Sequence, residues 1–264
     1  MAAIEHPANV TTGFVPTMGA FHEGHLQLMR RAKEENDRCV VSLFVNPTQF
    51  GKNEDFSKYP RNLERDAELA ESVGVDILFA PTPEEVYPRA SSMIHVPEVT
   101  ERWEGAHRPG HFDGVATVVC KLFNMVQPTT SYFGLKDLQQ CMVVQRMSED
   151  LNLPYALKFE PTVREPDGLA MSSRNAYLTE EQRAVAPMIY RQLTRCKDAL
   201  VDGSLAATEL SASEAALKNA GFAVDYFELV ELPSMQPVPV WSSNSAIIVT
   251  ARLGTTRLLD NILF

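Results

Sequence analysis

Two histidines near the N-terminus have the spacing and the setting of a phosphate site. His22 and His25 are separated by Glu23 and Gly24, and they stand between a short apolar run, 13–15, and a segment of helical periodicity. The N-terminus of a helix offers unpaired backbone N–H groups and the positive end of the helix dipole to a phosphate. Imidazoles placed there can stabilise negative charge that grows in a transition state. The simpler alternative is that both histidines only cap the helix.

A movable phosphate clamp is one interpretation of the polar run that follows Asp167 and Gly168. Ser172 and Ser173 supply short hydroxyl donors, and Arg174 can bind a phosphate through two parallel N–H groups. A solvated polar loop would contain the same residue types. This run therefore carries weight only together with the other motifs.

Lys136 and Asp137 follow a short apolar run that ends on Gly134. At the end of a strand and the start of a helix, Lys136 could contact a phosphate and Asp137 a magnesium ion or a ribose. The alternative is a glycine turn followed by an aspartate, which is favoured near a helix N-terminus. Gln139 and Gln140, next along the chain, also fit exposed positions of that helix.

Asn46 and Gln49 are polar side chains among aromatic residues. They lie in the sequence FVNPTQF, which leaves the apolar run 39–45. Directional hydrogen-bonding groups in otherwise apolar surroundings suit a small hydroxy acid. A turn made by Asn46 and Pro47 is the alternative.

These segments require a sheet to bring them together. Short apolar runs alternate with segments of helical periodicity through the first 160 residues, which is typical of a parallel sheet covered by crossover helices. The carboxyl ends of parallel strands meet at one sheet edge, so such a sheet would gather the motifs around one crevice. The predicted strands are 13–15, 39–45, 75–80, 131–134 and 155–160.

Four helices are predicted among these strands, from the spacing of their apolar residues. The predicted apolar faces are His25, Leu28, Met29 and Ala32 for the first helix and Leu63, Ala67, Ala70 and Val73 for the second, which ends at Gly74. The third helix is predicted over about 113–126, before Pro128, and the fourth over about 136–151.

The pattern changes after Gly168. Thr179 with Gln182 forms a capping box for a helix that is predicted to reach about Asp202, and a second helix ends at Gly221. The β-rich runs 222–232 and 246–253 close the chain.

We therefore predict two domains. Residues 1–162 form a Rossmann-like α/β domain, a parallel sheet with helices on both faces. Residues 163–264 form a smaller α/β or α+β domain.

The composition is that of an ordinary globular protein. Apolar residues make up 45%, and 34 acidic against 24 basic side chains give a formal charge of −10. This balance argues against a surface that mainly binds nucleic acid or an anionic membrane. No run of 18 apolar residues exists, and the N-terminus lacks an apolar signal region. We therefore expect a soluble cytoplasmic protein.

The four cysteines are Cys39, Cys120, Cys141 and Cys196. They are widely spaced, and none forms a C-x-x-C motif or a Cys/His cluster. We expect them to be reduced core residues rather than zinc ligands.

Taken together, the motifs resemble those of the pantothenate synthetases (pantoate-beta-alanine ligases), a family of the HxGH nucleotidylyltransferase superfamily. The resemblance spans nearly the whole chain and is far more specific than H-x-G-H alone. The stretches that carry it are GFVPTMGAFHEGHL, VSLFVNPTQF, YPRNLERD, RPGHFDGVATVVCKLFN, FGLKDLQQ, PTVREPDGLAMSSRNAYL and ARLGTTRLLDN.

The resemblance implies an ATP- and Mg²⁺-dependent ligase that makes pantothenate for coenzyme A biosynthesis. In such an enzyme the pantoate carboxylate attacks the α-phosphate of ATP, which gives pantoyl adenylate and pyrophosphate. The amine of beta-alanine then displaces AMP, because the mixed anhydride carries a good leaving group. The resemblance also implies a homodimer whose C-terminal domain carries the MSSR loop and closes over ATP.

The resemblance further implies roles for particular residues. The ATP-binding residues would be Met18, Gly19, Ala20, Phe21, His22, Glu23, Gly24, His25, Gly134, Leu135, Lys136, Asp137, Val163, Met171, Ser172, Ser173 and Arg174. The catalytic residues among them would be His22, His25 (the proton donor), Lys136, Ser172, Ser173 and Arg174. Pantoate and beta-alanine would contact Gln49, Gln140 and Asn46, and Mg²⁺ would contact Asp66 and Asp137.

Three features depart from the usual family pattern. Leu135 and Leu138 stand where the family has Glu and an aromatic residue, which we expect to change loop packing and nucleotide affinity rather than the reaction. Cys141 replaces a usual Leu, a change expected in the core. The family has a longer segment before its first strand, which indicates a late start at Met1 or loss of an N-terminal helix.

Two other functions are compatible with parts of the pattern. A nucleotidylyltransferase of the same superfamily could join a nucleotide to a phosphorylated substrate, although Gln49 and Gln140 suit a neutral polar pocket better. A nucleotide-binding protein without turnover is the second alternative. A tRNA-charging function is disfavoured, because a basic surface and an anticodon-binding domain are absent from the sequence pattern.

Overall fold

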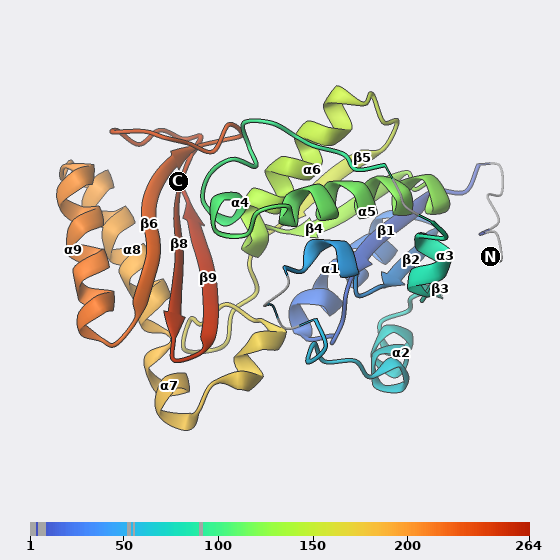
Figure 1. Cartoon of the computed structure of the whole chain (residues 1–264), viewed down its shortest axis with the longest axis horizontal. Helices are drawn as coiled ribbons and strands as arrows, with labels where there is room; N and C mark the ends of the chain where they lie inside the picture. Colours follow the sequence, from blue (N-terminus) through green and yellow to red (C-terminus); the bar gives the residue numbers. More distant parts are fainter. Residues whose placement is uncertain (1–3, 5–8, 52–53, 55, 90–91) are drawn as a thin grey trace. The chain divides into compact units, whose positions relative to one another are not determined.

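The structure is a computed structural model that describes residues 4, 9–51, 54, 56–89 and 92–264. The chain divides into two compact units (Figure 1). Unit 1 comprises Met1–Leu135 and Gln139–Pro161, and unit 2 comprises Lys136–Leu138 and Thr162–Phe264. The short segment 136–138 thus belongs with the C-terminal unit although unit 1 precedes and follows it in sequence.

Unit 1 contains a five-stranded parallel sheet with the strand order β3-β2-β1-β4-β5. Its strands are β1 (Thr12–Thr17), β2 (Arg38–Leu43), β3 (Ile77–Phe79), β4 (Thr130–Gly134) and β5 (Ala156–Glu160). All five strands predicted from the sequence are present. The chain runs outward from β1 to β3 and then crosses to β4 on the other side of β1, so the strand order reverses between β1 and β4. In open α/β sheets, ligands bind at the carboxyl ends of the strands at such a reversal.

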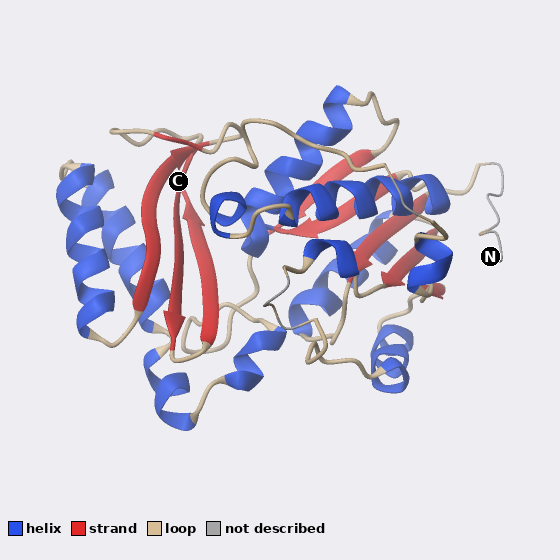
Figure 2. Ribbon diagram, viewed as in Figure 1, coloured by secondary structure: helices blue, strands red, loops and turns tan. Residues whose placement is uncertain are grey.

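Helices cover both faces of this sheet (Figure 2), as the sequence predicts. The helical elements between β1 and β5 along the chain are α1 (Glu23–Glu35), η1 (Pro47–Gln49), α2 (Leu63–Ser72), α3 (Pro83–Val86), α4 (Glu104–His107), α5 (His111–Val126), η2 (Leu135–Asp137) and α6 (Leu138–Asp150). Met29 of α1 and Ala70 of α2 share one core cluster with Val15 and Val41. On the opposite face, Phe123 of α5 packs edge-on against Phe14, with ring centroids 6.3 Å apart.

The predicted face of α2 is partly wrong. Leu63 is 57% exposed, whereas Asp66 and Ala70 are the buried residues of this helix. Leu69 and Val73 pack against the core beside Ala70. The helix is rotated from its apolar pattern because the Asp66 carboxylate accepts a hydrogen bond from the backbone of the β1–α1 loop, at Phe21.

Unit 2 is an α+β domain built on an antiparallel sheet with the order β7-β6-β8-β9. Its strands are β6 (Ala223–Glu231), β7 (Gln236–Pro237), β8 (Ser245–Leu253) and β9 (Thr256–Leu263). The helical elements that follow residue 162 are η3 (Ser173–Tyr177), α7 (Glu180–Val185), α8 (Met188–Val201) and α9 (Ala206–Asn219). Apolar residues of α8 and α9, such as Leu193 and Leu217, share a core with Leu229 and Ile247 of the sheet.

Two predictions for unit 2 need correction. The helix predicted from Thr179 to Asp202 is two helices, since α7 ends at Val185 and α8 begins after Pro187. Proline lacks the backbone N–H that a continuous helix needs and its ring clashes with the preceding turn. The capping box of Thr179 and Gln182 is present as predicted. Strand β9 was not predicted, because its buried polar residues interrupt the apolar pattern.

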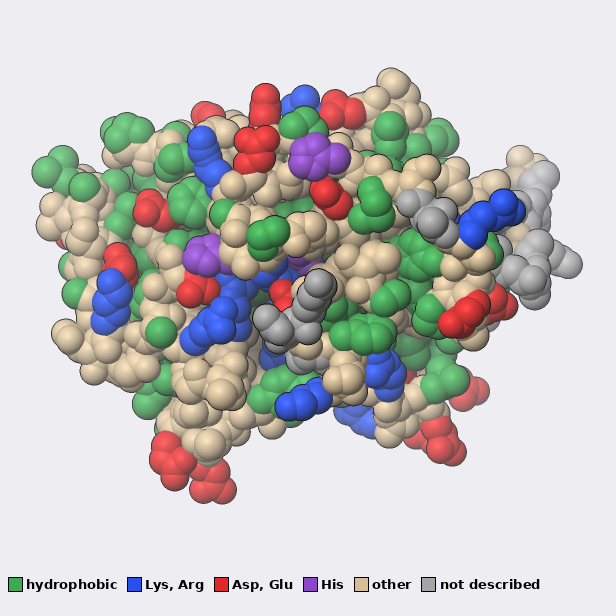
Figure 3. Space-filling view, viewed as in Figure 1, with side chains coloured by type: hydrophobic (Ala, Val, Ile, Leu, Met, Phe, Trp, Pro, Cys, Tyr) green, Lys and Arg blue, Asp and Glu red, His purple; other side chains and the backbone are tan. Residues whose placement is uncertain are grey.

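All four cysteines are free, and Cys39, Cys141 and Cys196 are buried as expected, whereas Cys120 is only partly buried. In the described part of the chain, no helix is long and apolar enough to cross a membrane. Acidic side chains are spread over the face shown in Figure 3, in keeping with the negative formal charge.

Candidate active site

The first helix begins at the H-x-G-H motif, and both histidines take part in its cap. The His22 ring accepts a hydrogen bond at Nδ1 from the backbone N–H of Gly24, at 3.2 Å. The His25 ring accepts at Nδ1 from the backbone N–H of His22, at 3.3 Å. The two rings lie 4.1 Å apart between centroids. The capping alternative is therefore correct as a description of the structure.

Capping fixes which nitrogen of each ring carries the proton. A neutral imidazole has one donor and one acceptor nitrogen. Because Nδ1 accepts in both rings, Nε2 is the protonated nitrogen of His22 and of His25. The cap therefore orients two N–H donors at a helix N-terminus, which is compatible with phosphate binding rather than an alternative to it.

The loop between β1 and α1 is held by two side chains from other parts of unit 1. The backbone N–H of Phe21 donates to Asp66 Oδ1 at 2.8 Å, and the Tyr59 hydroxyl donates to the carbonyl oxygen of Gly19 at 2.7 Å. Gly19 has φ +70°, and a Cβ there would lie 2.7 Å from Asp66 Oδ2 and 2.6 Å from Leu43 Cδ1. Glycine is thus required at this position.

Asp66 is 1% exposed, and burial raises the pKa of its carboxyl although the Phe21 N–H opposes this. Mg²⁺ usually keeps several waters and takes one or two protein carboxylates together with substrate phosphates. Asp66 fits that requirement poorly, because its carboxylate is buried and one of its oxygens already accepts a hydrogen bond from the backbone. The side chain of Asp137 is 46% exposed and fits it better. Among the described residues, no group of three or more His, Cys, Asp or Glu side chains could hold a metal on its own.

Asn46 and Gln49 are brought together at the carboxyl end of β2. Asn46 is 1% exposed and donates from Nδ2 to Gln49 Oε1 at 3.0 Å and to the Gly114 carbonyl at 3.1 Å. Its Oδ1 accepts from the Tyr87 hydroxyl at 2.9 Å, and the side chain also caps η1. Asn46 therefore fixes the Gln49 side chain. The alternative interpretation, a turn made by Asn46 and Pro47, also describes the structure, since η1 begins there.

Gln49 links this cluster to the β1–α1 loop. Its Nε2 lies 3.2 Å from the sulfur of Met18, a residue expected in the ATP site. Gln49 is 7% exposed. Helix α5 approaches the same turn closely, because a Cβ on Gly114 would lie 2.5 Å from the Thr48 carbonyl oxygen.

A network around the Gln49 carbonyl was missed in the sequence. His111, 9% exposed, contacts this oxygen through Nδ1 at 2.8 Å. Arg108 contacts His111 Nε2 at 3.0 Å and binds Glu54 through two nitrogens, at 2.7 and 2.5 Å. Burial, followed by the positive charge of Arg108, lowers the pKa of His111 to about 4. In the sequence, Arg108 and His111 stand out only as part of the stretch RPGHF, which does not indicate that they contact Gln49 or Glu54.

Gln139 does not occupy the exposed position that was considered for it. It is 6% exposed and donates to the carbonyl oxygens of Val99 and Arg102, at 2.8 and 2.9 Å. Its Oε1 accepts from the backbone N–H of Glu104 at 3.0 Å. Gln139 thus fixes the segment before α4, and its neighbour Gln140 is half-buried in the first turn of α6.

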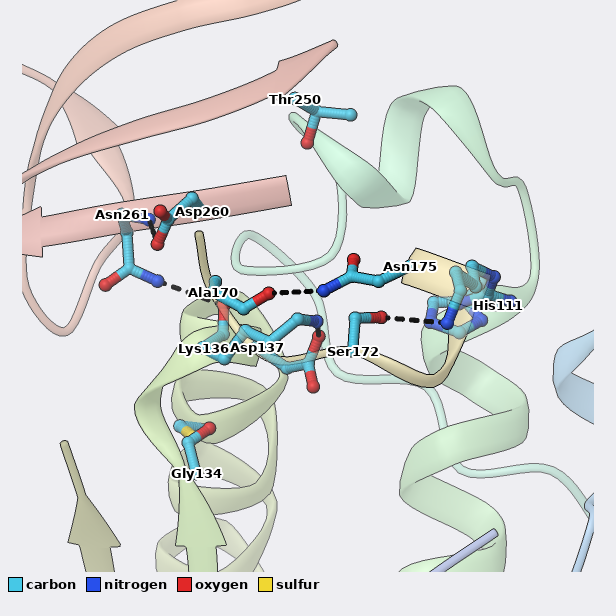
Figure 4. Close-up of polar contacts among 12 residues, drawn as sticks. His111, Gly134, Lys136, Asp137, Ala170, Ser172, Asn175, Thr250, Asp260 and Asn261 are labelled. Atoms are coloured by element: carbon cyan, nitrogen blue, oxygen red, sulfur yellow. Dashed lines mark hydrogen bonds and ion pairs between the residues drawn. The ribbon is translucent and has the colours of Figure 1, made fainter. Parts of the chain in front are cut away.

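Unit 2 carries its own polar pocket, which contains three of the predicted catalytic residues. The lining residues are Lys136, Leu169, Ala170, Ser172, Arg174, Asn175, Ile189, Arg257, Leu258, Leu259 and Asp260. Lys136 Nζ lies 3.2 Å from Asp137 Oδ1, and these two side chains are drawn side by side in Figure 4. The pocket therefore combines three cationic side chains with the hydroxyl of Ser172, groups that bind a polyanion, and its one carboxylate, Asp260, is paired with Arg164.

A short hairpin presents the serine run to this pocket. The Met171 N–H donates to the Val163 carbonyl at 3.0 Å, and the turn between them is closed by Gly168, with φ +95°. The Ser172 hydroxyl then caps η3, which begins at Ser173, by accepting from the Arg174 N–H at 3.3 Å. The run is thus an ordered cap and turn.

The chain is similar along nearly its whole length to pantoate-beta-alanine ligases. The family model for pantoate-beta-alanine ligase matches residues 2–263. Pantothenate synthetase from Heliobacterium modesticaldum is 51% identical over 254 residues, which are 95% of this chain and 90% of that protein. The enzyme from Thermus thermophilus is 49% identical over 253 residues, 95% of this chain and 92% of that protein.

Solved structures agree with the sequence relatives. The crystal structure of the Thermus thermophilus protein has a TM-score of 0.93 at 49% identity and covers 96% of this chain and 93% of that chain. Pantoate-beta-alanine ligase from Francisella tularensis, complexed with beta-gamma ATP and beta-alanine, has a TM-score of 0.84 at 35% identity, covering 98% and 91%. The chain therefore belongs to the pantoate-beta-alanine ligase family, the pantothenate synthetases.

Proposed function

We propose that this protein condenses pantoate with beta-alanine to give pantothenate, AMP and pyrophosphate, for coenzyme A biosynthesis. The family match over residues 2–263 is the observation that carries the proposal. The pantoate carboxylate attacks the α-phosphate of ATP, and pyrophosphate leaves. The amine of beta-alanine then attacks the carbonyl of pantoyl adenylate, and AMP leaves with the bonding electrons.

The N-terminus of α1 acts on the triphosphate in the first step. His22 and His25 each direct an Nε2–H donor from the helix cap, and the helix dipole adds to their effect. His25 donates its hydrogen bond to the charge that develops on the phosphate as pyrophosphate leaves. Met18, Gly19, Ala20, Phe21, Glu23 and Gly24 supply the loop and first turn that present these donors.

Lys136, Ser172, Ser173 and Arg174 supply the remaining stabilising groups. Lys136, Ser172 and Arg174 line one pocket of unit 2. An ammonium, a guanidinium and hydroxyl donors match the oxygens of a triphosphate, whose transfer depends on positioning and on electrostatic stabilisation. Gly134, Leu135, Val163 and Met171 shape the backbone on either side of these groups.

Gln49 and Gln140 hold pantoate, and Gln49 also borders the beta-alanine site. Gln49 is directed by Asn46, which is itself fully engaged by Gly114 and Tyr87. A fixed amide in a largely closed position discriminates among hydroxy acids better than a mobile one, because a mismatched substrate leaves it unpaired.

Mg²⁺ neutralises charge on the phosphates when it is bound. The exposed carboxylate of Asp137 fits this role, since a metal that is mainly held by substrate needs few protein ligands. Asp66 instead holds the β1–α1 loop through Phe21.

Product analysis tests the proposed reaction. With ATP, pantoate, beta-alanine and Mg²⁺, equal amounts of pantothenate, AMP and pyrophosphate should form, and omission of pantoate should stop all three. Formation of ADP, or turnover only with a phosphorylated acceptor, would contradict the proposal. The homodimer and the cytoplasmic location remain predictions, and the mass in solution tests the first.

A further inference from the structure

Strand β9 carries two adjacent polar residues, Asp260 and Asn261, that are both buried and that contact different partners. Asp260 is 5% exposed and Asn261 is 4% exposed. Neighbouring residues of a strand face opposite sides of a sheet, and polar groups are buried only where they are paired. Both residues lie in unit 2, in a strand whose register with β8 pairs Asp260 with Val249 and Asn261 with Ile248. Asp260 lines the pocket of unit 2, but neither residue has a part in the proposed chemistry.

Asn261 reaches the segment that carries Lys136. Its Nδ2 donates to the carbonyl oxygen of Lys136 at 3.0 Å (Figure 4). The segment 136–138 belongs to unit 2 although β4 before it and the rest of α6 after it belong to unit 1. This hydrogen bond joins the Lys136 backbone to the C-terminal sheet.

Asp260 reaches the hairpin that carries the serine run. Its two oxygens bind the guanidinium of Arg164 at 2.6 and 2.9 Å, and the carbonyl of Asn261 accepts a further bond from Arg164 at 3.2 Å. Arg164 also donates to the Gly168 carbonyl at 3.1 Å, and its Cζ lies 3.7 Å from the centre of the Tyr190 ring.

The Arg164 side chain thus contacts Asp260, Asn261, Gly168 and Tyr190 at once. These contacts attach the hairpin 163–171 to β9. The hairpin leads directly into Ser172, whose hydroxyl caps η3 at Arg174. Bidentate arginine–carboxylate pairs are among the most geometrically specific contacts in proteins. The position of Asp260 thus sets the position of the serine run.

We infer that Asp260 and Asn261 are positioning residues that align Lys136 with the Ser172–Arg174 run. One dipeptide of a single strand holds both phosphate-binding segments of unit 2, so an error in its position would displace one set of charges from the other. Neither residue is required to touch substrate. The inference rests on the proposed function, because the aligned groups act on the triphosphate of ATP.

The test is a double-mutant cycle between Asn261 and Lys136. The quantity measured for each variant is the rate of pyrophosphate release. Asn261→Ala removes the hydrogen bond to the Lys136 carbonyl and leaves the Lys136 side chain in place. It should lower kcat for pyrophosphate release roughly ten-fold, with the KM for pantoate changed less than about two-fold. In a Lys136→Ala background, Asn261→Ala should cause little further loss, because the group that it positions is gone.

Matched variants separate positioning from folding. Leucine has a volume similar to that of asparagine but cannot donate the hydrogen bond. Asn261→Leu should therefore reproduce the kinetic loss, and a cooperative thermal transition will show that the variant is folded. Glu209→Gln removes an ion pair with Arg195 elsewhere in unit 2 and should leave kcat unchanged. If neither Asn261 variant folds, Arg164→Lys keeps the charge opposite Asp260 but loses the two-pronged contact, and it should lower kcat with the same KM pattern.

Two results would overturn the inference. One is a wild-type kcat in the folded Asn261→Ala and Asn261→Leu variants. The other is a full, multiplicative loss on adding Asn261→Ala to Lys136→Ala. Pyrophosphate release by the wild-type enzyme tests the proposed function separately. If the wild type releases none, calorimetry with ATP replaces the rates, and equal affinities of wild type and Asn261→Ala contradict the inference.

Discussion

The imidazole of His111 donates from Nδ1 to the carbonyl oxygen of Gln49, at 2.8 Å, because a carbonyl can only accept. The other ring nitrogen therefore accepts from Arg108, at 3.0 Å. This arrangement requires a neutral ring, since a second proton would meet the guanidinium. The turn that carries Gln49 is thus held by a histidine that must stay uncharged.

The stability of the fold should consequently fall in mild acid. The pKa of His111 is about 4 in the folded protein against an ordinary 6.5, so the unfolded chain binds the extra proton first as the pH falls. The contribution of His111 is fully present above pH 6.5 and is lost between pH 6.5 and 4, by about 3 kcal/mol in total. Urea unfolding across this range measures the loss.

A substitution of His111 checks the assignment. His111→Asn should flatten this part of the pH profile, because the group that takes up the proton is removed. An unchanged slope in His111→Asn would show that another group titrates.

Gly114→Ala should damage both stability and pantoate binding. Alanine normally favours a helix, but here its Cβ would lie 2.5 Å from the Thr48 carbonyl oxygen and force α5 away from the turn of Gln49. We expect a loss of roughly 1–3 kcal/mol in the free energy of unfolding and an increase in the KM for pantoate. Gly51→Ala is the control, because the nearest atom to its Cβ would be 3.7 Å away. Equal effects of the two variants would refute the steric argument.

Substitutions of His22 should separate capping from catalysis. Asparagine is a good N-cap residue, so His22→Asn should keep the thermal stability of the wild type while it loses the Nε2–H donor and most of the adenylation rate. His22→Ala should lose the rate and also about 1 kcal/mol of stability. If His22→Asn were as fast as the wild type, the histidine would have only a structural role.

Replacement of His25 by Ala should slow adenylation by roughly 100-fold or more, the range of general acid catalysis, while the fold persists. Rapid-quench measurement of pyrophosphate release gives the rate of this step, and circular dichroism checks the fold. A rate within a few-fold of the wild type would remove the proposed role.

The two predicted metal carboxylates should behave differently. Asp137→Asn should raise the Mg²⁺ concentration needed for half-maximal rate, because its exposed carboxylate would be lost as a ligand. Asp66→Asn keeps an acceptor for the Phe21 N–H and should leave that concentration nearly unchanged. A shift in the Mg²⁺ requirement that is confined to Asp66→Asn would reverse the assignment.

The strands and the motifs of unit 1 could be predicted because their signals are local. Each of the five strands contains apolar residues within a short segment, and His22 and His25 stand where the first strand meets its helix. The capping box at Thr179 is local too. The break at Pro187 is a local signal as well, since proline ends a helix.

The contacts that position the site could not be predicted in the same way. Arg108 and His111 act on Gln49 from about sixty positions away in the chain, and Asn261 bonds to Lys136 across a longer separation. No periodicity encodes such partners. The burial of Asp260 also ran against the sequence pattern, because a charged residue in a strand is normally exposed unless it is paired.

Pyrophosphate release from ATP with pantoate but without beta-alanine tests the central claim most directly. A formed adenylate predicts a rapid release of about one pyrophosphate per active site, dependent on pantoate, and continuous release only after beta-alanine is added. Absence of this release from a sample that binds ATP, or release that does not depend on pantoate, would contradict the account.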